Sequence, residues 1–146
     1  MILIGQSIQP IDKEGQISLP ANMSKALHDH AYLTQGFDRN LLLMSSDSFE
    51  KMYSFIKNTS ISDPLARLLL RLFLGNAVEL NIDGSGEIHL PSNLREYAGD
   101  SDKVILVGQG DYIEIWSPPS WEEQTASLRD YQANVNRFAK FNLAAI

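Results

Sequence analysis

The sequence predicts a β-rich α+β protein built from two similar halves. A nine-residue frame, Asp-x-x-Gly-x-Ile-x-Leu-Pro, occurs at residues 12–20 and again at residues 83–91. In both copies apolar and polar residues alternate, which is typical of a strand with one buried face. Because the repeat extends over a whole half of the chain rather than over a short period, it indicates a duplicated unit and not a solenoid.

A tight turn opens each copy of the frame. Gly15 and Gly86 lie where the chain must reverse, and glycine accepts a positive φ without a steric penalty from Cβ. An aspartate at the start of such a turn accepts hydrogen bonds from backbone N–H groups two or three residues further on. We therefore expect Asp12 and Asp83 to be structural residues of the two turns.

Strands and short helices complete each half. Residues 78–82 and 87–90 alternate on either side of the second turn, which predicts a β-hairpin there. Further strand pairs are predicted at 31–34 with 41–44 and at 104–107 with 112–116, and short helices are predicted at 22–27 and 92–97.

Three longer helices are predicted outside the strands. Asp47 is a suitable N-cap for the first. The second begins at Asp63-Pro64 and ends near Gly75, and its largely apolar surface predicts burial between the halves or contact with another subunit. The third follows Pro119 as one long amphipathic segment. Its apolar stripe consists of Trp121, Leu128, Tyr131, Val135 and Phe138.

These elements divide the chain into a first repeat (residues 1–58), a connecting helix (59–75), a second repeat (76–120) and a C-terminal helix and tail (121–146). A half of about 70 residues buries too little surface to be more than marginally stable alone. We therefore expect the two halves to pack on each other or on neighbouring chains.

Composition narrows the class of function. The chain has no cysteine, which excludes disulfides and thiolate metal sites. Its 18 acidic and 12 basic residues give a net charge of −6, which argues mildly against a polyanionic partner. No basic segment with a long apolar stretch opens the sequence, and the longest apolar run is too short to span a bilayer. We expect a cytoplasmic protein without a membrane partner.

Motifs of enzymes are missing from the sequence. It contains no Gly-x-Ser-x-Gly, no glycine-rich phosphate loop ending in Lys-Ser/Thr and no His-Glu-x-x-His. His28 and His30 lie two residues apart, but no third ligand suggests a metal site. We therefore predict neither enzymatic activity nor a cofactor. His89 is expected on an exposed strand face, and Trp116 and Trp121 are expected to pack in a core or an interface.

Several segments around the repeated frame carry a family resemblance. Residues 73–77 read Phe-Leu-Gly-Asn-Ala, residues 94–99 read Leu-Arg-Glu-Tyr-Ala-Gly, and residues 107–118 begin Val-Gly-Gln-Gly-Asp-Tyr. With these segments, about residues 1–130 of the chain resemble the MraZ family of bacterial transcriptional regulators.

The resemblance implies a fold and a function. The fold would be two tandem AbrB-like swapped-hairpin modules packed pseudo-symmetrically, with flanking helices. The protein would be a nucleoid-associated, ring-like homo-oligomer. It would bind double-stranded DNA with short repeats in the promoter of the division and cell-wall gene cluster, and it would need no cofactor.

One departure from the family pattern concerns DNA contact. In the family each turn reads Asp-x-x-Gly-Arg, and the resemblance implies that the residue after glycine contacts DNA. This chain has Gln16 and Glu87 at these positions. Glutamine can hydrogen-bond adenine, whereas a carboxylate repels phosphates and accepts only from a cytosine amino group. The candidate DNA-binding residues are therefore Lys13, Gln16 and Lys25, with Glu87 at the motif position of the second turn.

Other functions stay open at this point. Gln16, Glu87 and the negative net charge favour a diverged scaffold that holds other proteins and has lost DNA binding. An AbrB-like antitoxin is a third hypothesis, although no clear toxin-binding tail is present. Arg67 and Arg71 share a helix face, and we expect them to form ion pairs rather than to contact DNA.

Overall fold

The computed structural model describes residues 2–59 and 62–143 of the 146-residue chain. Two antiparallel sheets form its centre: a six-stranded sheet with the order β1-β7-β8-β4-β3-β5 and a two-stranded sheet of β2 and β6. The strands are β1 (Gln6–Pro10), β2 (Gln16–Ser18), β3 (His30–Gln35), β4 (Leu41–Ser45), β5 (Val78–Asn81), β6 (Glu87–His89), β7 (Lys103–Gly108) and β8 (Tyr112–Trp116).

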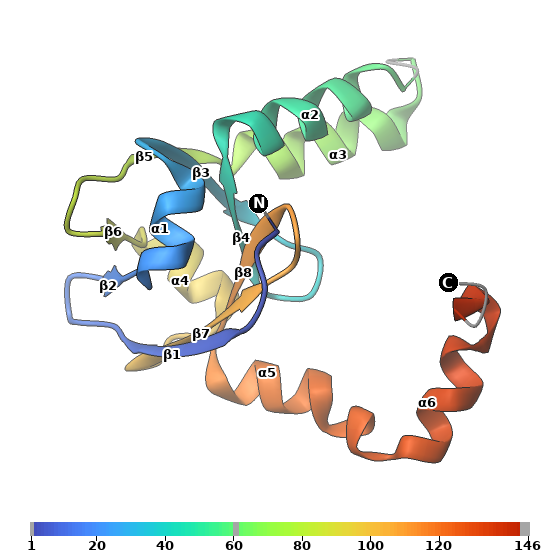
Figure 1. The fold of residues 1–146 in the computed structure, drawn as a ribbon. Coiled ribbons are helices and arrows are strands. Elements are labelled where there is room, and N and C mark those ends of the chain that lie inside the picture. The colour runs from blue at the N-terminus through green and yellow to red at the C-terminus, as the bar shows by residue number, and fades with distance from the viewer. Residues whose placement is uncertain (1, 60–61, 144–146) are drawn as a thin grey trace.

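Helices flank this centre. Figure 1 shows α1 and α4 beside the small sheet, α2 and α3 side by side at one end of the large sheet, and α5 and α6 reaching away from the body. The helices are α1 (Ala21–Leu27), α2 (Ser46–Lys57), α3 (Pro64–Gly75), α4 (Ser92–Ala98), α5 (Pro118–Thr125), α6 (Tyr131–Phe138) and the short 3-10 helices η1 (Ala126–Arg129) and η2 (Ala139–Phe141). The predicted α+β class with flanking helices is thus confirmed.

The strand order of the large sheet is symmetric with respect to the two halves of the chain. The first strand of each half pairs with the third strand of the other half, since β1 lies beside β7 and β5 lies beside β3, while the fourth strands β4 and β8 pair at the centre. The second strands pair with each other as β2 and β6. Each half therefore completes its sheets with strands of the other, and the two halves share one core.

The predicted hairpin around the second turn is wrong. Strand β5 pairs with β3, and β6 pairs with β2, so the two strands that flank the turn belong to different sheets. The turn carries the chain from the edge of the large sheet to the small one. Alternating residues correctly indicate which face of each strand is buried, but they do not specify the neighbouring strand.

Two helix predictions also need correction. The N-cap of α2 is Ser45 rather than Asp47, because the Ser45 hydroxyl accepts a hydrogen bond from the backbone N–H of Ser48 (3.2 Å). The long helix predicted after Pro119 is broken. Asp130 leaves helical geometry (ψ +94°), and its carboxylate caps a new helix, α6, by accepting from the N–H of Ala133 (3.1 Å).

The core lies between the two sheets. Ile17 and Ile88 face each other across the small sheet, each 2% exposed, and pack toward large-sheet residues such as Leu33 and Leu106. Burying a side chain of this size contributes roughly 1.5–3 kcal/mol. The alternating apolar residues of the repeated frame therefore pack the small sheet against the large one.

A carboxylate is half-buried beside the large sheet. Glu114 on β8 accepts hydrogen bonds from the side-chain amide of Asn40 (2.9 Å) and from the indole N–H of Trp116 (3.2 Å). Burial is the largest effect and raises the pKa of Glu114 above its ordinary value of 4.5. The two hydrogen bonds oppose this rise, and the nearby charge of Asp38 adds to it.

We predict that this carboxylate gives stability a pH dependence. Between pH 4.5 and the raised pKa of Glu114, this carboxyl binds more protons in the folded protein than in the unfolded chain. The free energy of unfolding therefore falls as pH rises through that range. Replacing Glu114 with Gln removes the titrating group. Urea unfolding across this range should show a steeper decline for the wild type than for Glu114→Gln, and parallel profiles would contradict the prediction.

Candidate nucleic-acid interface

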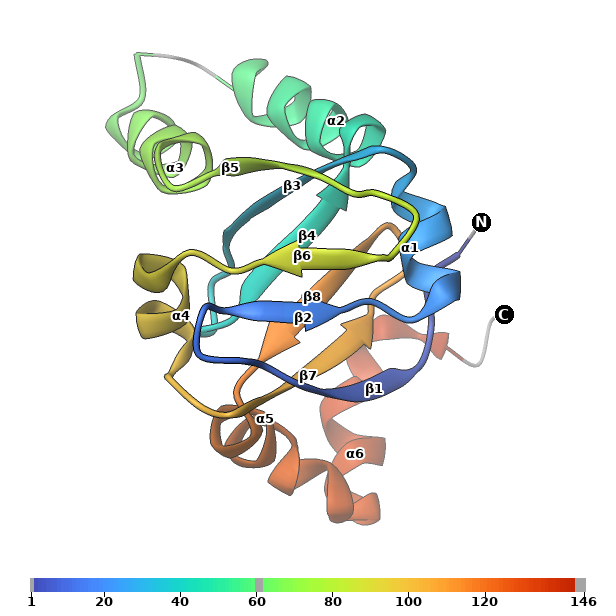
Figure 2. The same ribbon diagram turned by 90° about the vertical axis from the view of Figure 1, so that its left-hand side faces the viewer.

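The small sheet and the two turns form one exposed ribbon. Figure 2 shows β2 and β6 side by side on one side of the molecule, with one turn at either end. Gln16 is opposite His89, and Ser18 is opposite Glu87. Because Ile17 and Ile88 point into the core, these four neighbours point outward. Ser18, Glu87 and His89 are exposed and Gln16 is half-buried.

Each turn is closed by its aspartate. The Asp12 carboxylate accepts hydrogen bonds from the backbone N–H groups of Glu14 (3.0 Å) and Gln16 (2.8 Å). The Asp83 carboxylate accepts from the hydroxyl and from the backbone N–H of Ser85. These bonds, the hydroxyl bond foremost, lower the pKa of Asp83. Both carboxylates thus hold their turns in shape.

Each turn is tied to the end of the opposite strand by one of a reciprocal pair of backbone hydrogen bonds. The N–H of Leu90 donates to the carbonyl of Gly15 (2.8 Å), and the N–H of Leu19 donates to the carbonyl of Gly86 (2.9 Å). Both glycines have a positive φ, +88° and +74°. A Cβ atom on Gly15 would lie 2.6 Å from the Leu90 oxygen, so no other residue fits there without movement.

The structure separates the predicted DNA-binding residues. Lys13 is exposed in the first turn, and Gln16 starts the strand that follows it. Lys25 lies elsewhere, on α1, whose Ser24 approaches Gly86 of the second turn. There Lys25 lines a polar depression of about 280 Å³. The first turn and the lysine that follows it in sequence are therefore at opposite ends of the ribbon.

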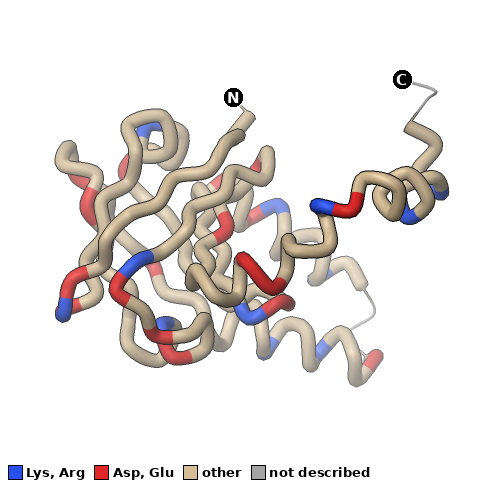
Figure 3. The backbone as a smooth tube through the Cα atoms, turned by 90° about the horizontal axis from the view of Figure 1, so that it is seen from below, with Lys and Arg blue, Asp and Glu red and all other residues tan. Residues whose placement is uncertain are grey.

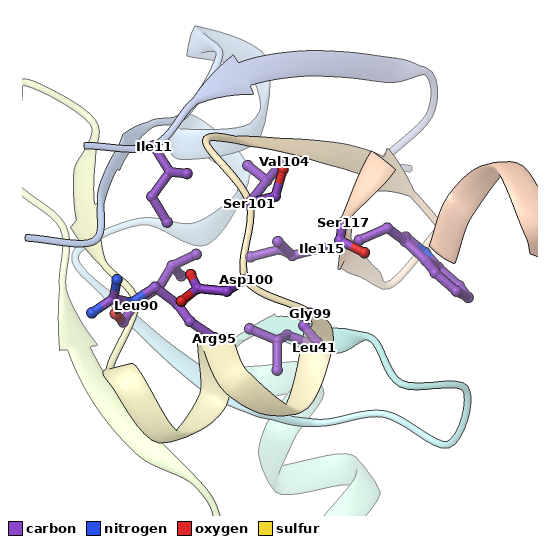
Figure 4. A pocket seen from close by; sticks show the side chains of 12 residues that line it. Ile11, Leu41, Leu90, Arg95, Gly99, Asp100, Ser101, Val104, Ile115 and Ser117 are labelled. Carbon is purple, nitrogen blue, oxygen red and sulfur yellow. Dashed lines mark hydrogen bonds between the residues drawn. The ribbon is translucent and has the colours of Figure 1, made fainter. Parts of the chain in front are cut away.

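Arg95 was missed by the sequence analysis, although it lies beside the first turn. Its Nε donates to the carbonyl of Leu90 (2.9 Å), and its guanidinium packs so close to Gly15 that an added Cβ would lie 2.9 Å from Nε. Figure 4 shows the side chain extending from α4 toward Leu90. The sequence does contain one signal for this position. Arg95 follows Ser24 by 71 residues, which is also the offset between the two turns, so Arg95 and Ser24 occupy equivalent positions of the two halves.

The cavity next to Arg95 is not a ligand site. Its volume is about 10 Å³, room for about one water molecule. Ile11, Val104 and Ile115 contribute much of its apolar lining (Figure 4).

Charge is distributed unequally along the ribbon. Lys13 and Arg95 stand at the first turn, while residues 83–89 carry Asp83 and Glu87 and no lysine or arginine. Over the whole body, acidic and basic positions are interspersed (Figure 3). The first turn thus combines two cations with the carboxylates Asp12 and Glu14, whereas the second turn and its strand carry carboxylates alone.

The other residues singled out from sequence take ordinary structural positions. Trp116 is 2% exposed and its ring centroid lies 5.5 Å from that of Trp121, which confirms the packing prediction. His30 Nδ1 lies 3.3 Å from a Glu79 carboxylate oxygen. Arg67 donates to the carbonyl of Ser62 (3.0 Å). Residues 2–59 and 62–143 contain no cluster of metal-ligating side chains, and no helix in these ranges is long and apolar enough to cross a bilayer.

Fold and ribbon together define a protein whose two halves exchange strands and present a shared two-stranded surface. A family model described as "MraZ protein, putative antitoxin-like" matches residues 73–142. A Transcriptional regulator MraZ of Thermomicrobium roseum is 37% identical over 127 residues, covering 87% of this chain and 89% of that protein. Another, from Alkaliphilus oremlandii, is 32% identical over 143 residues, covering 97% and 100%. The chain belongs to the MraZ family.

We predict that Gly15→Ala destabilises the protein through the ribbon. The alanine Cβ would clash with the Leu90 oxygen at a φ that disfavours any side chain, so the free energy of unfolding should fall by about 1–3 kcal/mol. Gly84→Ala is the matched control, because nothing lies within 4 Å of its added Cβ. Chemical unfolding measures both; equal losses in the two variants would contradict the assigned role of Gly15.

Proposed function

We propose that this protein is a transcriptional regulator that binds double-stranded DNA containing short repeats through the exposed β2–β6 ribbon. The observation that carries the proposal is that both turns lie at the ends of one two-stranded ribbon on one side of the molecule (Figure 2). The relatives from Thermomicrobium roseum and Alkaliphilus oremlandii bear the name Transcriptional regulator MraZ, which supports the same class of function.

The shape and chemistry of the ribbon suit the major groove of DNA. A groove about 12 Å wide admits a two-stranded β-ribbon, and its floor presents the edges of the bases. Gln16 supplies an amide that can pair with the N6 and N7 atoms of adenine, while Lys13 supplies a phosphate contact. We therefore assign contact with the bases to Gln16, and contact with the DNA backbone, which positions the protein, to Lys13.

We further propose that copies of the chain assemble into a ring-like homo-oligomer. A groove of about 580 Å³ on α3 is lined mainly by apolar residues, among them Phe37, Leu65 and Leu68, with Arg71 and Asn76 as its polar members. The apolar stripe on η1 and α6 is also uncovered, with Tyr131 81% and Val135 67% exposed. Two different apolar surfaces on one chain permit a head-to-tail contact, and such contacts close into rings when the rotation allows it.

Assembly would strengthen DNA binding by multivalency. A second ribbon on the same oligomer meets a neighbouring DNA repeat as an intramolecular event, which raises avidity by roughly 10² to 10⁴. From the family we infer that the target is the promoter of the division and cell-wall gene cluster, and that the protein acts in the cytoplasm at the nucleoid.

A second candidate function is a protein-binding scaffold without DNA contact. One observation favours it: the exposed Glu87 carboxylate stands where a phosphate contact is needed, and the second turn carries no cation. A carboxylate facing the DNA backbone weakens binding by repulsion and removes roughly one released counterion.

Titration of a labelled duplex from the region upstream of the gene tests the proposal. We predict binding at low salt that weakens as salt rises, and about fivefold weaker binding for Gln16→Ala. Gln16→Arg combined with Glu87→Arg adds two cations and should steepen the salt dependence by about two units per engaged protomer. A wild type that stays unbound at low salt, together with a double variant that binds, would favour the scaffold.

Assembly is tested by the molar mass in solution. We predict that Leu68→Asp in the α3 groove, or Val135→Asp on the stripe, reduces the oligomer to smaller species, because each places a charge in the proposed apolar contact. Both residues are more than half exposed (58% and 67%), so folding should persist. Ile8→Asp, at a 65% exposed position on β1, is the control and should keep the wild-type mass in light scattering.

A further inference from the structure

We propose that Arg95 contacts the DNA backbone, as a cation that the second half of the chain supplies to the first turn. This inference rests on the proposed function and deepens it. It implies that the ribbon does not bind DNA symmetrically. The end formed by Lys13, Gln16 and Arg95 makes the charged contact, and the end with Glu87 contributes shape and hydrogen bonds.

The first support is the position of the guanidinium. Arg95 reaches back along α4 to the carbonyl of Leu90, and its Nε and Cζ atoms lie against Gly15, immediately before β2. The side chain is half-buried and is held between a helix and the turn. A cation that is already fixed in place loses less conformational entropy on binding a phosphate than a free side chain does.

The second support is that most of the guanidinium is unused. Its Nε bond to Leu90 occupies one of five N–H donors. Arg95, unlike His30 and Arg129, is in no ion pair that the structure of residues 2–59 and 62–143 shows. The two terminal nitrogens of an arginine match the spacing of phosphate oxygens and can bind them in a bidentate manner.

The third support comes from comparing the two ends. At the second turn, Ser24 takes the place that Arg95 has at the first: both lie on the helix of the other half, 71 positions apart, and both approach the turn glycine. Serine brings no charge, and the adjoining strand begins with Glu87. Beside the turn glycine, the same backbone position therefore holds a cation at the first end and a neutral hydroxyl at the second.

A purely structural role for Arg95 makes a different prediction. Anchoring Leu90 would affect stability, whereas a phosphate contact affects how binding depends on salt. The logarithm of the binding constant falls with the logarithm of salt by about 0.9 for each phosphate neutralised. The salt slope is thus a readout that a structural role alone does not move.

The experiment measures fluorescence anisotropy of a labelled upstream duplex at several salt concentrations, with thermal unfolding of each variant. We expect Arg95→Gln to lower the slope by about one unit per engaged protomer and affinity by about fivefold to tenfold at 0.1 M salt. Arg95→Lys should retain most of the slope, because it retains the charge. Lys57→Gln, on the far end of α2 from the ribbon (Figure 1), removes the same charge and should change neither quantity.

A gain-of-function variant covers the case in which Arg95→Gln fails to fold. Ser24→Arg in a Glu87→Gln background places an arginine beside the second turn, as Arg95 lies beside the first. The salt slope of DNA binding should then exceed that of Glu87→Gln alone by about one unit per engaged protomer. Unchanged slopes in the folded variants would overturn the role of Arg95 while leaving the proposed function intact. A wild type that does not bind at low salt would instead overturn the proposed function itself.

Discussion

The reciprocal hydrogen bonds between the two turns and the opposite strands are the constraint on which the fold depends. Leu19 donates to Gly86 and Leu90 donates to Gly15, so each half satisfies a backbone group of the other. A buried N–H without a partner costs free energy comparable to a lost hydrogen bond. Neither half can therefore close its small sheet alone. The strand exchange that makes one core out of two marginal halves also creates the exposed ribbon.

Backbone symmetry and side-chain chemistry have diverged in this ribbon. The positive φ of both glycines, the aspartate-closed turns and the facing isoleucines keep the two ends alike. The side chains on that frame differ: Lys13 and Arg95 stand at one end, and Glu87 stands at the other. Turn geometry and burial constrain the first set of residues, because the glycines adopt a positive φ and the isoleucines fill the core. The solvent-facing positions are free to change with the ligand.

Local sequence patterns predicted which residues of a strand are buried, but not which strand lies beside it. Alternation correctly identified the buried faces of β2 and β6, since Ile17 and Ile88 are both 2% exposed. It could not identify their pairing, because a strand pattern contains no information about the neighbour across the ladder. Arg95 escaped for the same reason. Its approach to Gly15 is produced by strand exchange between halves, 80 residues apart in sequence, and no local pattern reports such a contact.

The net charge of −6 is compatible with the proposed DNA contact of the ribbon, because the overall charge and a direct contact with phosphate act over different distances. At 0.1 M salt, charges more than about 10 Å apart are largely screened from each other, whereas a guanidinium on a phosphate lies well within that distance. An acidic body therefore slows the approach to DNA more than it weakens the bound state. In the proposed interface, Lys13 and Arg95 would give each ribbon only a weak single contact. In the proposed assembly, specificity comes from the spacing of ribbons relative to the spacing of DNA repeats, since only matching spacings let successive weak contacts form together.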